Sequence, residues 1–523
     1  MADTRQDQAT RGGSDEAGRQ FGTVFFVSVG ISVAFVGVGV LFTEPFTTAL
    51  SSVVDGIVAG LGWLYLLLTT LFLAFVLVLA FSRYGKIRLG GPDAKPEFRL
   101  FPWFAMLFQA GMGIGLLFWG VAEPVMHYRN PPPGLTTAST PDAASLGMQY
   151  SFFHWTLHPW AIYAVVGLAV AYFSFNKGMP SLRISGVLRP LLGSRVDGPI
   201  GKAVDVLAVI ATLFGVAVSL GLGTLQINAG LGEVFGLPSG TLLQLVIISL
   251  TAVAYLLSAS TPIDRGISYL SQSSMVLAVV LLLYVFVAGP TLLQLNFFTQ
   301  EIGGYLANLV PMSLRTSPME SSQWLGEWTI FFWATWIAWA PYVGTFIARI
   351  SRGRTIREFI VGVLAAPSLF SMIWFSVLGS SGIELDNRLG GQINAAAEQD
   401  EALAMFRFLE QYPGFLITAI LALFLVWIFF IAGADAGTVV LGSMSGAGLN
   451  PPRTSRLTWG LIMAALAAIL LIAGGLDALQ NGAILAATPF AVLMVAICWS
   501  LYRSLVRDQA LARQRAGGGT SEG

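Results

Sequence analysis

The sequence predicts an all-α polytopic membrane protein with twelve transmembrane helices. Of its 523 residues 55% are hydrophobic and only 11% are charged, and the mean hydropathy is +0.73. Apolar runs of about twenty residues, long enough to cross a bilayer, recur along the chain. Between them no nucleophile–base pair and no metal cluster is apparent, so we do not expect an enzyme.

The predicted spans follow one another with short connections. They lie near residues 22–42, 59–81, 101–121, 146–173, 204–226, 240–259, 266–289, 328–347, 358–379, 413–440, 457–473 and 481–502. Residues 21–503 therefore form one membrane domain between an N-terminal tail, residues 1–20, and a C-terminal tail, residues 504–523. The polar first twenty residues and the stretch after Arg515 are predicted to be disordered.

The basic residues predict the orientation of the chain. With the N-terminus inside, 24 of the 28 Lys and Arg residues fall on inner segments, and the outer ones are Arg129, Arg315, Arg388 and Arg407. Cytoplasmic loops carry such an excess, so both termini are predicted to be cytoplasmic in a cell (inner or plasma) membrane. The first apolar run lacks a cleavage motif for a signal peptide. The single cysteine, Cys498, excludes an intramolecular disulfide.

Two connecting segments are amphipathic. Residues 178–202 mix basic and apolar side chains, as a cytoplasmic interfacial helix does. Residues 290–320 form an outer segment that is too polar to span the membrane. Each segment either lies on the lipid surface or packs against a neighbouring subunit.

The third span contains Gly111, Gly113 and Gly115. Each glycine weakens a helix by about 1 kcal/mol relative to alanine. Irregular backbone inside a membrane is tolerated only where protein covers it or where it lines a cavity. We therefore expect an unwound binding segment here, and close helix packing is the alternative.

The eighth span holds Trp328, Trp333, Trp336 and Trp339, and Pro341 is predicted to break it. Deep tryptophans form a wall of π-faces suited to a cation, whereas Trp328 is expected to lie in an interfacial belt. Breaks in spans 3 and 8 predict two inverted five-helix repeats, spans 3–7 and 8–12, preceded by two extra helices.

The fourth span adds a second aromatic group. On one helix, Trp155, Trp160 and Tyr163 share a broad face and, opposite Trp336, would cage a quaternary ammonium or sulfonium head. With no Cys, Asp or third His near them in the sequence, His154 and His158 are interpreted as packing or hydrogen-bonding residues rather than metal ligands or proton carriers.

Two acidic residues fall within or beside the spans, where ionisable groups are functional candidates. Glu123 is expected to cap or bond near the outer end of span 3. For Asp435 two roles stay open: bonding to backbone beside Gly433 and Gly437, or carrying a coupled proton.

At these residues the chain resembles the betaine/choline/carnitine transporter family over nearly its whole length. The resemblance rests on the stretches GMGIGLLFWGVAEPVMHY, FHWTLHPWAIYAVVGLAVAYF and WTIFFWATWIAWAPYVGTFIARISRGRTIREF, residues 111–128, 153–173 and 328–359. It implies a sodium-symporter-like inverted-repeat fold, a homotrimer and a trimethylammonium-type substrate. It also implies an aromatic box of Trp155, Trp160, Tyr163 and Trp336, a permeation path along Trp339, Tyr342 and Phe346, and substrate contacts at Met112 and Gly113.

The chain departs from the family pattern at positions that bear on substrate and ion. Thr335 stands where relatives usually have tryptophan. Gly115 replaces the aspartate of choline-preferring members, which favours a zwitterion over a bare cation. Ala432-Gly433 replaces a Thr-Ser pair of one sodium site, and in the other Thr212 is retained while Val216 replaces its partner. Only weak sodium contacts, at Thr212 and Tyr342, remain, so coupling to Na+, to H+ or to neither stays open.

The sequence therefore predicts a secondary transporter that imports a zwitterionic quaternary ammonium or sulfonium osmolyte by alternating access. An ion-independent, carnitine-like substrate/product exchanger is the alternative within the family. A channel or a non-transporting receptor is the alternative from another class. No cofactor and no nucleic-acid partner is expected.

Overall fold

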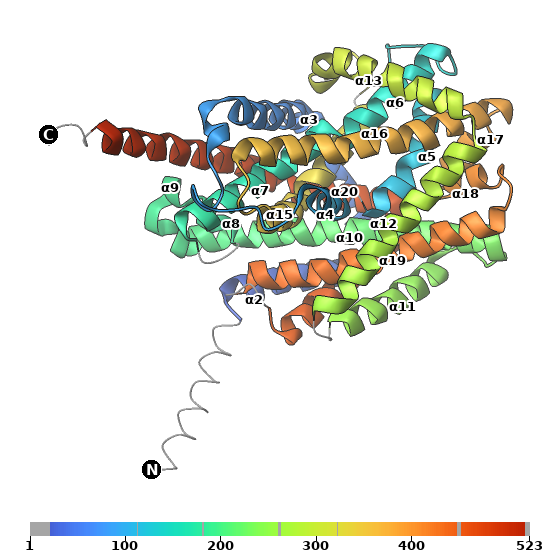
Figure 1. Ribbon diagram of the computed structural model, residues 1–523. Coiled ribbons are helices and arrows are strands. Elements are labelled where there is room, and N and C mark those ends of the chain that lie inside the picture. Colours follow the sequence, from blue (N-terminus) through green and yellow to red (C-terminus); the bar gives the residue numbers. More distant parts are fainter. Residues whose placement is uncertain are drawn as a thin grey trace.

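The chain is helical throughout the part that the structure describes, which confirms the all-α class (Figure 1). This computed structural model describes residues 21–517, with gaps at 112, 180–182, 260–262, 322 and 447–450. Met112 and the predicted N-terminal tail thus lie outside the described residues. Within these ranges the extended pairing is a single antiparallel bridge between Arg88 and Thr355.

The helices are arranged along the chain as follows. The first half comprises α2 (Thr23–Leu41), α3 (Thr43–Phe81), η1 (Arg83–Lys86), α4 (Leu100–Gly111), α5 (Gly113–Arg129), α6 (Pro141–Trp155), α7 (Leu157–Lys177), α8 (Ile184–Val187), α9 (Arg189–Leu192), η2 (Gly193–Asp197), α10 (Pro199–Phe235), α11 (Thr241–Ala259) and α12 (Ile263–Ala288). The second half comprises α13 (Thr291–Ser313), α14 (Gln323–Leu325), η3 (Gly326–Ile330), α15 (Phe331–Ile350), α16 (Ile356–Arg388), α17 (Gln392–Gln399), α18 (Leu403–Leu409), α19 (Phe415–Ser445) and α20 (Arg453–Gly517).

Among the described residues, nine helices are long and apolar enough to cross a membrane, or ten if one bent pair counts as a span. The longest, Arg453–Leu511 within α20, contains a kink at Gly474 and Gly475, where Gly475 has φ 58° and joins two helices. A polytopic membrane fold follows from these helices. The count of twelve spans stays a prediction.

The span predicted to break at Pro341 is continuous, so that prediction is wrong. Helix α15 runs from Phe331 to Ile350 with Pro341 inside it, and four further helices also contain an internal proline, at Pro124, Pro311, Pro367 and Pro489. A proline removes one backbone hydrogen bond, but neighbouring helices in a membrane bundle compensate for the loss. Matching breaks therefore no longer support the inverted repeats, which stay a prediction.

Helix interruptions occur instead in the third and fourth spans. Helix α4 ends at Gly111 and α5 begins at Gly113, which has φ +20°. Helix α6 ends at Trp155 and α7 begins at Leu157, because Thr156 has φ −120° and ψ −110°. Trp155 and Tyr163 thus do not share one helix, as the helical-wheel prediction assumed.

The two connecting segments predicted to be amphipathic have different structures. The described part of 178–202 forms the short turns α8, α9 and η2 instead of one interfacial helix. The segment 290–320, which is predicted to be outer, contains helix α13, bent by 110° from Ser273–Ala288. It turns Glu301 and Tyr305 toward α6 and α16 and exposes Leu292 and Val310.

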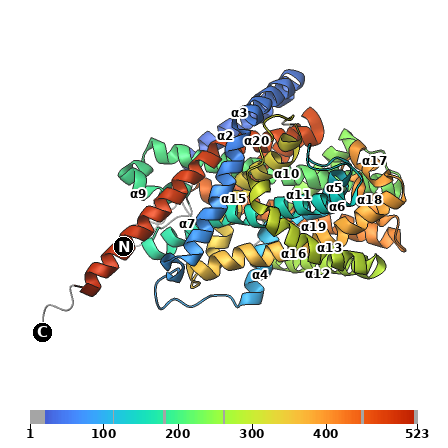
Figure 2. The ribbon, with the colours of Figure 1, turned by 90° about the horizontal axis from the view of Figure 1, so that it is seen from above.

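Helix α20 continues through most of the predicted C-terminal tail and projects from the bundle (Figures 1 and 2). Asp508 attaches it to α7 by accepting hydrogen bonds from Tyr172 and Lys177. The tail predicted from residue 504 is therefore helical up to Gly517.

Candidate functional site: an aromatic box beside two helix breaks

Four predicted aromatic residues meet in the interior. Their rings contact in sequence: Trp155 to Trp336 at 5.0 Å between centroids, Trp336 to Tyr163 at 6.2 Å and Tyr163 to Trp160 at 5.5 Å. Each pair is nearly perpendicular, at 75° to 85°. All four side chains are buried. The structure thus brings the residues of the predicted aromatic box together, with faces that can attract a cation.

The break at Thr156 places two of these rings. Pro159 has no N–H, so the carbonyl of Trp155 loses the donor that a continuous helix would supply. The Thr156 hydroxyl donates to the carbonyl of Phe152 at 2.6 Å and lies 3.0 Å from the Tyr305 hydroxyl. Trp155 therefore ends one helix while Trp160 lies in the first turn of the next.

The glycines of the third span leave room for these rings. A Cβ atom on Gly111 would lie 2.5 Å from the Trp160 ring, and one on Gly115 would lie 2.5 Å from the Trp155 ring. Any side chain at either position would displace a wall of the box. A Cβ on Gly113, by contrast, would meet nothing within 4 Å. The absence of a side chain at Gly111 and Gly115 thus lets the two tryptophan rings pack against the third span, while Gly113 faces open space.

Hydrogen bonds fix two of the indoles and leave other donors free. Trp155 Nε1 donates to Glu123 Oε2 at 2.7 Å, and Trp336 Nε1 donates to the carbonyl of His154 at 2.9 Å. Trp160 Nε1 and Tyr163 Oη are buried without a partner among the described residues, as is Thr335 Oγ1. Buried donors of this kind normally have partners, so these groups suit an acceptor on a ligand.

Glu123 is not a terminal cap but belongs to a buried cluster with two histidines. Glu123, His127 and His154 are all fully buried. His154 Nδ1 lies 2.7 Å from Glu123 Oε1, and His127 Nε2 lies 3.4 Å from the same oxygen. The sequence-based view that no third histidine or acid joins His154 is therefore wrong. Helix packing brings Glu123 to it across 31 positions.

This cluster is hydrogen-bonded rather than arranged around an ion. Its three donor atoms lie within 4.8 Å of one another. Two ligands of a tetrahedral zinc ion, each about 2.0 Å from the metal, lie about 3.3 Å apart. The 2.7 Å between His154 Nδ1 and Glu123 Oε1 is shorter and fits a shared proton. His158 is separate: its Nε2 bonds Ser313 Oγ at 3.0 Å.

Trp339 and Tyr342 form a second aromatic pair, turned toward α10. Trp339 Nε1 donates to the carbonyl of Gly215 at 2.6 Å, and its ring lies 5.6 Å from Tyr342. Phe346 is half-buried one turn beyond. Among the described residues no ring contact joins Trp339 or Tyr342 to the four residues of the aromatic box, and the role of these three residues in a permeation path stays a prediction.

The remaining predicted residues have other surroundings. Thr212 Oγ1 lies 3.9 Å from Met444 Sδ. Asp435 accepts a 2.7 Å hydrogen bond from the Ser258 hydroxyl, rather than from backbone beside Gly433. Trp328 is 8% exposed and packs 4.3 Å from His127. The prediction that it belongs to an interfacial belt is therefore wrong.

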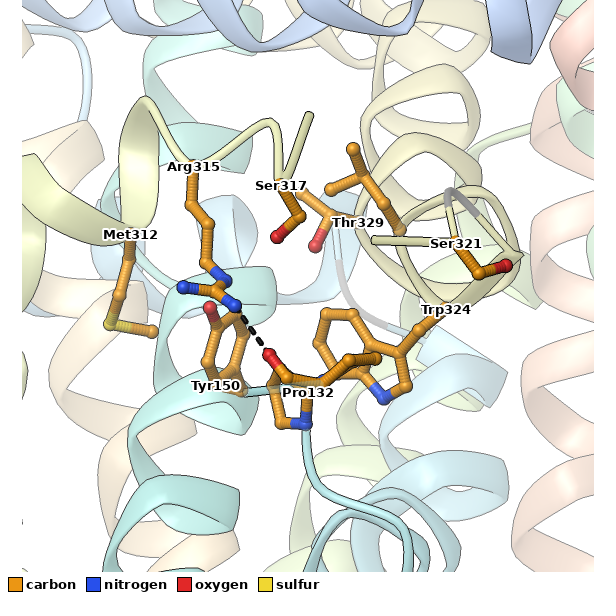
Figure 3. A pocket seen from close by; sticks show the side chains of 10 residues that line it. Pro132, Tyr150, Met312, Arg315, Ser317, Ser321, Trp324 and Thr329 are labelled. Carbon is orange, nitrogen blue, oxygen red and sulfur yellow. Dashed lines mark hydrogen bonds between the residues drawn. The ribbon is translucent and has the colours of Figure 1, made fainter. Parts of the chain in front are cut away.

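A pocket lies beside the cluster, next to segments that are predicted to be outer (Figure 3). Tyr150, Arg315, Trp324 and Thr329 are among its lining residues, and we call it the outer pocket. Arg315 donates to the carbonyl of Pro133 across its mouth. Thr329 belongs to the π-helical segment η3 and lies 3.0 Å from His154 Nε2. The outer pocket thus connects through Thr329 to the buried cluster.

A helical membrane bundle with interrupted spans around a buried aromatic site is the architecture of a membrane carrier. The family model for "BCCT, betaine/carnitine/choline family transporter" matches residues 23–510. The chain belongs to this family, and it is a transporter and not an enzyme.

Relatives of known name match nearly from end to end. The chain is 49% identical to the glycine betaine transporter OpuD of Bacillus subtilis (strain 168), over 94% of this chain and 96% of that protein. It is 43% identical to a probable glycine betaine transporter of Desulfitobacterium hafniense (strain Y51), over 93% and 98%. It is 40% identical to an ectoine/hydroxyectoine transporter of Virgibacillus pantothenticus, over 94% and 98%.

Proposed function

We propose that this protein is a secondary active transporter that imports glycine betaine, or a close zwitterionic analogue, by alternating access. The observation that carries the proposal is the aromatic box, in which Trp155, Trp160, Tyr163 and Trp336 make contacts of 5.0 to 6.2 Å. A trimethylammonium group has no N–H to donate, so π-faces are the groups that recognise it.

Unpartnered hydrogen-bond donors favour a zwitterionic substrate over a bare cation. Trp160 Nε1, Tyr163 Oη and Thr335 Oγ1 are buried without partners among the described residues, and they can donate to a carboxylate. Each good cation–π contact contributes about 0.5–2 kcal/mol. Micromolar binding requires about 8 kcal/mol, so the box needs such carboxylate contacts in addition.

The test is uptake of radiolabelled glycine betaine by cells that express Trp336→Leu. We expect uptake to be lost while the protein stays folded in the membrane, because leucine fills space but presents no π-face. The matched control is Trp63→Leu on α3, a half-exposed tryptophan that bonds its own helix at Gly60. Wild-type uptake by Trp336→Leu would reject the box as the substrate site.

An ion-independent exchanger is the second candidate, and Ala432-Gly433 favours it because neither residue offers a side-chain hydroxyl to sodium. Proteoliposomes separate the candidates when gradients of sodium, protons or internal substrate are imposed one at a time. Accumulation with an ion gradient alone supports the importer. Uptake that requires internal substrate supports the exchanger.

The proposal includes a homotrimer in the cell membrane with both termini in the cytoplasm. The trimer is supported by the family membership and by α13, which presents Leu292, Leu306 and Val310 outward. The orientation is supported by the charge distribution. A further support is that Glu401 lies close enough to Asp477 and Glu327 to experience their charges, because these three residues belong to three different segments that are all predicted to be outer.

A further inference from the structure

The buried Glu123–His154 pair has no permanent counter-charge. Glu123 forms ion pairs only with His127 and His154 among the described residues, and no lysine or arginine reaches it. Its other oxygen accepts from Trp155 Nε1 at 2.7 Å. A net negative charge in the dry centre of a bundle is costly, and one added proton removes it. The pair is thus built to hold an exchangeable proton.

The pair is also connected to the outside. A neutral imidazole donates from one nitrogen and accepts at the other, so it can take a proton on one side and release one on the opposite side. His154 Nδ1 faces Glu123 at 2.7 Å, and its Nε2 faces Thr329 Oγ1 at 3.0 Å. Thr329 lines the outer pocket (Figure 3). These contacts form a path from the outer pocket to Glu123.

The pair touches the aromatic box directly. The carboxylate of Glu123 holds the indole of Trp155, and the backbone of His154 holds the indole of Trp336. An ionised Glu123 places a negative charge behind the wall that a trimethylammonium group would approach. A protonated Glu123 does not. The charge of the substrate and the proton therefore act on the same buried group.

We infer that Glu123 and His154 form a proton-binding site, reached through Thr329, at which a proton and a cationic substrate head compete for one buried negative charge. The inference rests on the proposed function, because it requires a cation in the aromatic box. Substrate binding then releases a proton from the pair, through His154 and Thr329, to the outer pocket. The affinity for substrate rises with pH.

Other titratable groups face the pair from each element around it. On α5 there is His127 and on α6 Tyr150. His158 on α7 packs against the same Phe153 ring as His154, Glu301 on α13 bonds Gln149 on α6, and Arg315 lies across the outer pocket. Charged groups on the other elements packed against α5 have partners other than the pair: Asp386 bonds Arg129, Glu398 bonds Asn130, Arg407 bonds Glu233 and Asp435 bonds Ser258. Of these groups, His127 is the one that contacts Glu123.

The experiment is calorimetric titration of the full-length protein in nanodiscs with glycine betaine, in buffers of different ionisation enthalpy. We expect wild type to release close to one proton per substrate bound, and its affinity to rise about tenfold per pH unit where the pair titrates. Glu123→Gln, whose amide can still accept from Trp155, should release none and bind with pH-independent affinity. Release by Glu123→Gln equal to wild type would overturn the assignment.

The matched control is Glu301→Gln. Glu301 is also fully buried and bonds Gln149 at 2.7 Å, but it lies on α13. This variant should release the wild-type number of protons. Thr329→Val should release the same number but more slowly in a stopped-flow experiment with a pH indicator, and Thr329→Ser should restore the rate. An unchanged rate in Thr329→Val would reject the path.

The outcomes for wild type separate this inference from the proposed function. If wild type does not bind glycine betaine, the proposed function fails. If it binds without releasing a proton, or takes one up, the competition is rejected while the proposed function stands. Infrared difference spectra of wild type need no variant. Loss of a carboxylic-acid C=O band or of an imidazolium band on adding glycine betaine supports the inference, and spectra in which both bands stay unchanged contradict it.

Discussion

Position 115 has room only for glycine, because one atom of the Trp155 ring lies where a side chain would begin. A Cβ there would lie 2.5 Å from the Trp155 ring, whereas ordinary contacts begin near 3.4 Å. Gly115→Ala should therefore push Trp155 out of the aromatic box and weaken the binding of glycine betaine about tenfold, which corresponds to about 1.4 kcal/mol. Calorimetry or the quenching of tryptophan fluorescence measures this change.

Gly60→Ala is the control for this substitution. Gly60 lies in helix α3, and a Cβ there would meet nothing within 4 Å. The control gains helix propensity and should bind as wild type does. Wild-type affinity in Gly115→Ala would show that Trp155 is free to move and that the box is not rigid.

At the residue scale, the sequence predicted which aromatic side chains come together better than it predicted their hydrogen-bond partners. Trp155, Trp160, Tyr163 and Trp336 stand out because tryptophan is rare at membrane depth. The Glu123–His154 bond was not predicted, since only helix packing brings the two residues together. One signal was present: Glu123 and His127 are four positions apart, which places them on the same face of a helix.

At the element scale, glycine residues were a better guide to irregular helix backbone than proline residues. The irregular backbone at Gly113, where φ is +20°, agrees with the predicted unwinding of the third span, because several glycines together weaken a helix wherever it lies. The break at Pro341 was wrong, and the one at Thr156 was missed. Whether a proline interrupts a membrane helix depends on groups from neighbouring helices that replace its lost hydrogen bond. Those groups are not adjacent in the sequence.

Glu401, in the segment between α17 and α18, is expected to make the stability of the protein depend on pH. Burial and the nearby charges of Asp400, Asp477 and Glu327 raise the pKa of Glu401 to about 7. Its folded pKa lies above its unfolded value, near 4.3, so its contribution to stability is present at pH 4 and is lost as the pH rises through 7. The melting temperature of Glu401→Gln should therefore lie a few degrees above that of wild type at pH 8, and the two melting temperatures should be equal at pH 4.5.

Thermal unfolding in detergent, followed across this pH range, checks the expectation. The control is Glu410→Gln, an exposed acid on the same outer segment that pairs with Arg407. It should keep the wild-type dependence on pH. If Glu401→Gln and wild type have parallel curves, Glu401 does not hold a proton in the folded protein.

At the scale of the whole molecule, the distribution of charge contains the information about orientation. The net charge is zero, yet only Arg129, Arg315, Arg388 and Arg407 fall on segments predicted to be outer. Three of these bond acidic groups nearby, namely Asp386, Glu320 and Glu384, and Arg407 bonds Glu233 and Glu410. The basic residues predicted to be outer thus form local ion pairs, and the predicted topology rests on the excess of basic residues on the segments predicted to be inner.

The orientation can be measured with single cysteines, because the chain has only Cys498, which is buried. In a Cys498→Ala background, Leu135→Cys lies in the exposed loop between α5 and α6, and Leu511→Cys lies near the exposed end of α20. A membrane-impermeant maleimide should label Leu135→Cys in intact cells and Leu511→Cys only after permeabilisation. The Cys498→Ala background should stay unlabelled in both conditions. Labelling of Leu511→Cys in intact cells, with Leu135→Cys protected, would reverse the topology and place the outer pocket on the cytoplasmic side.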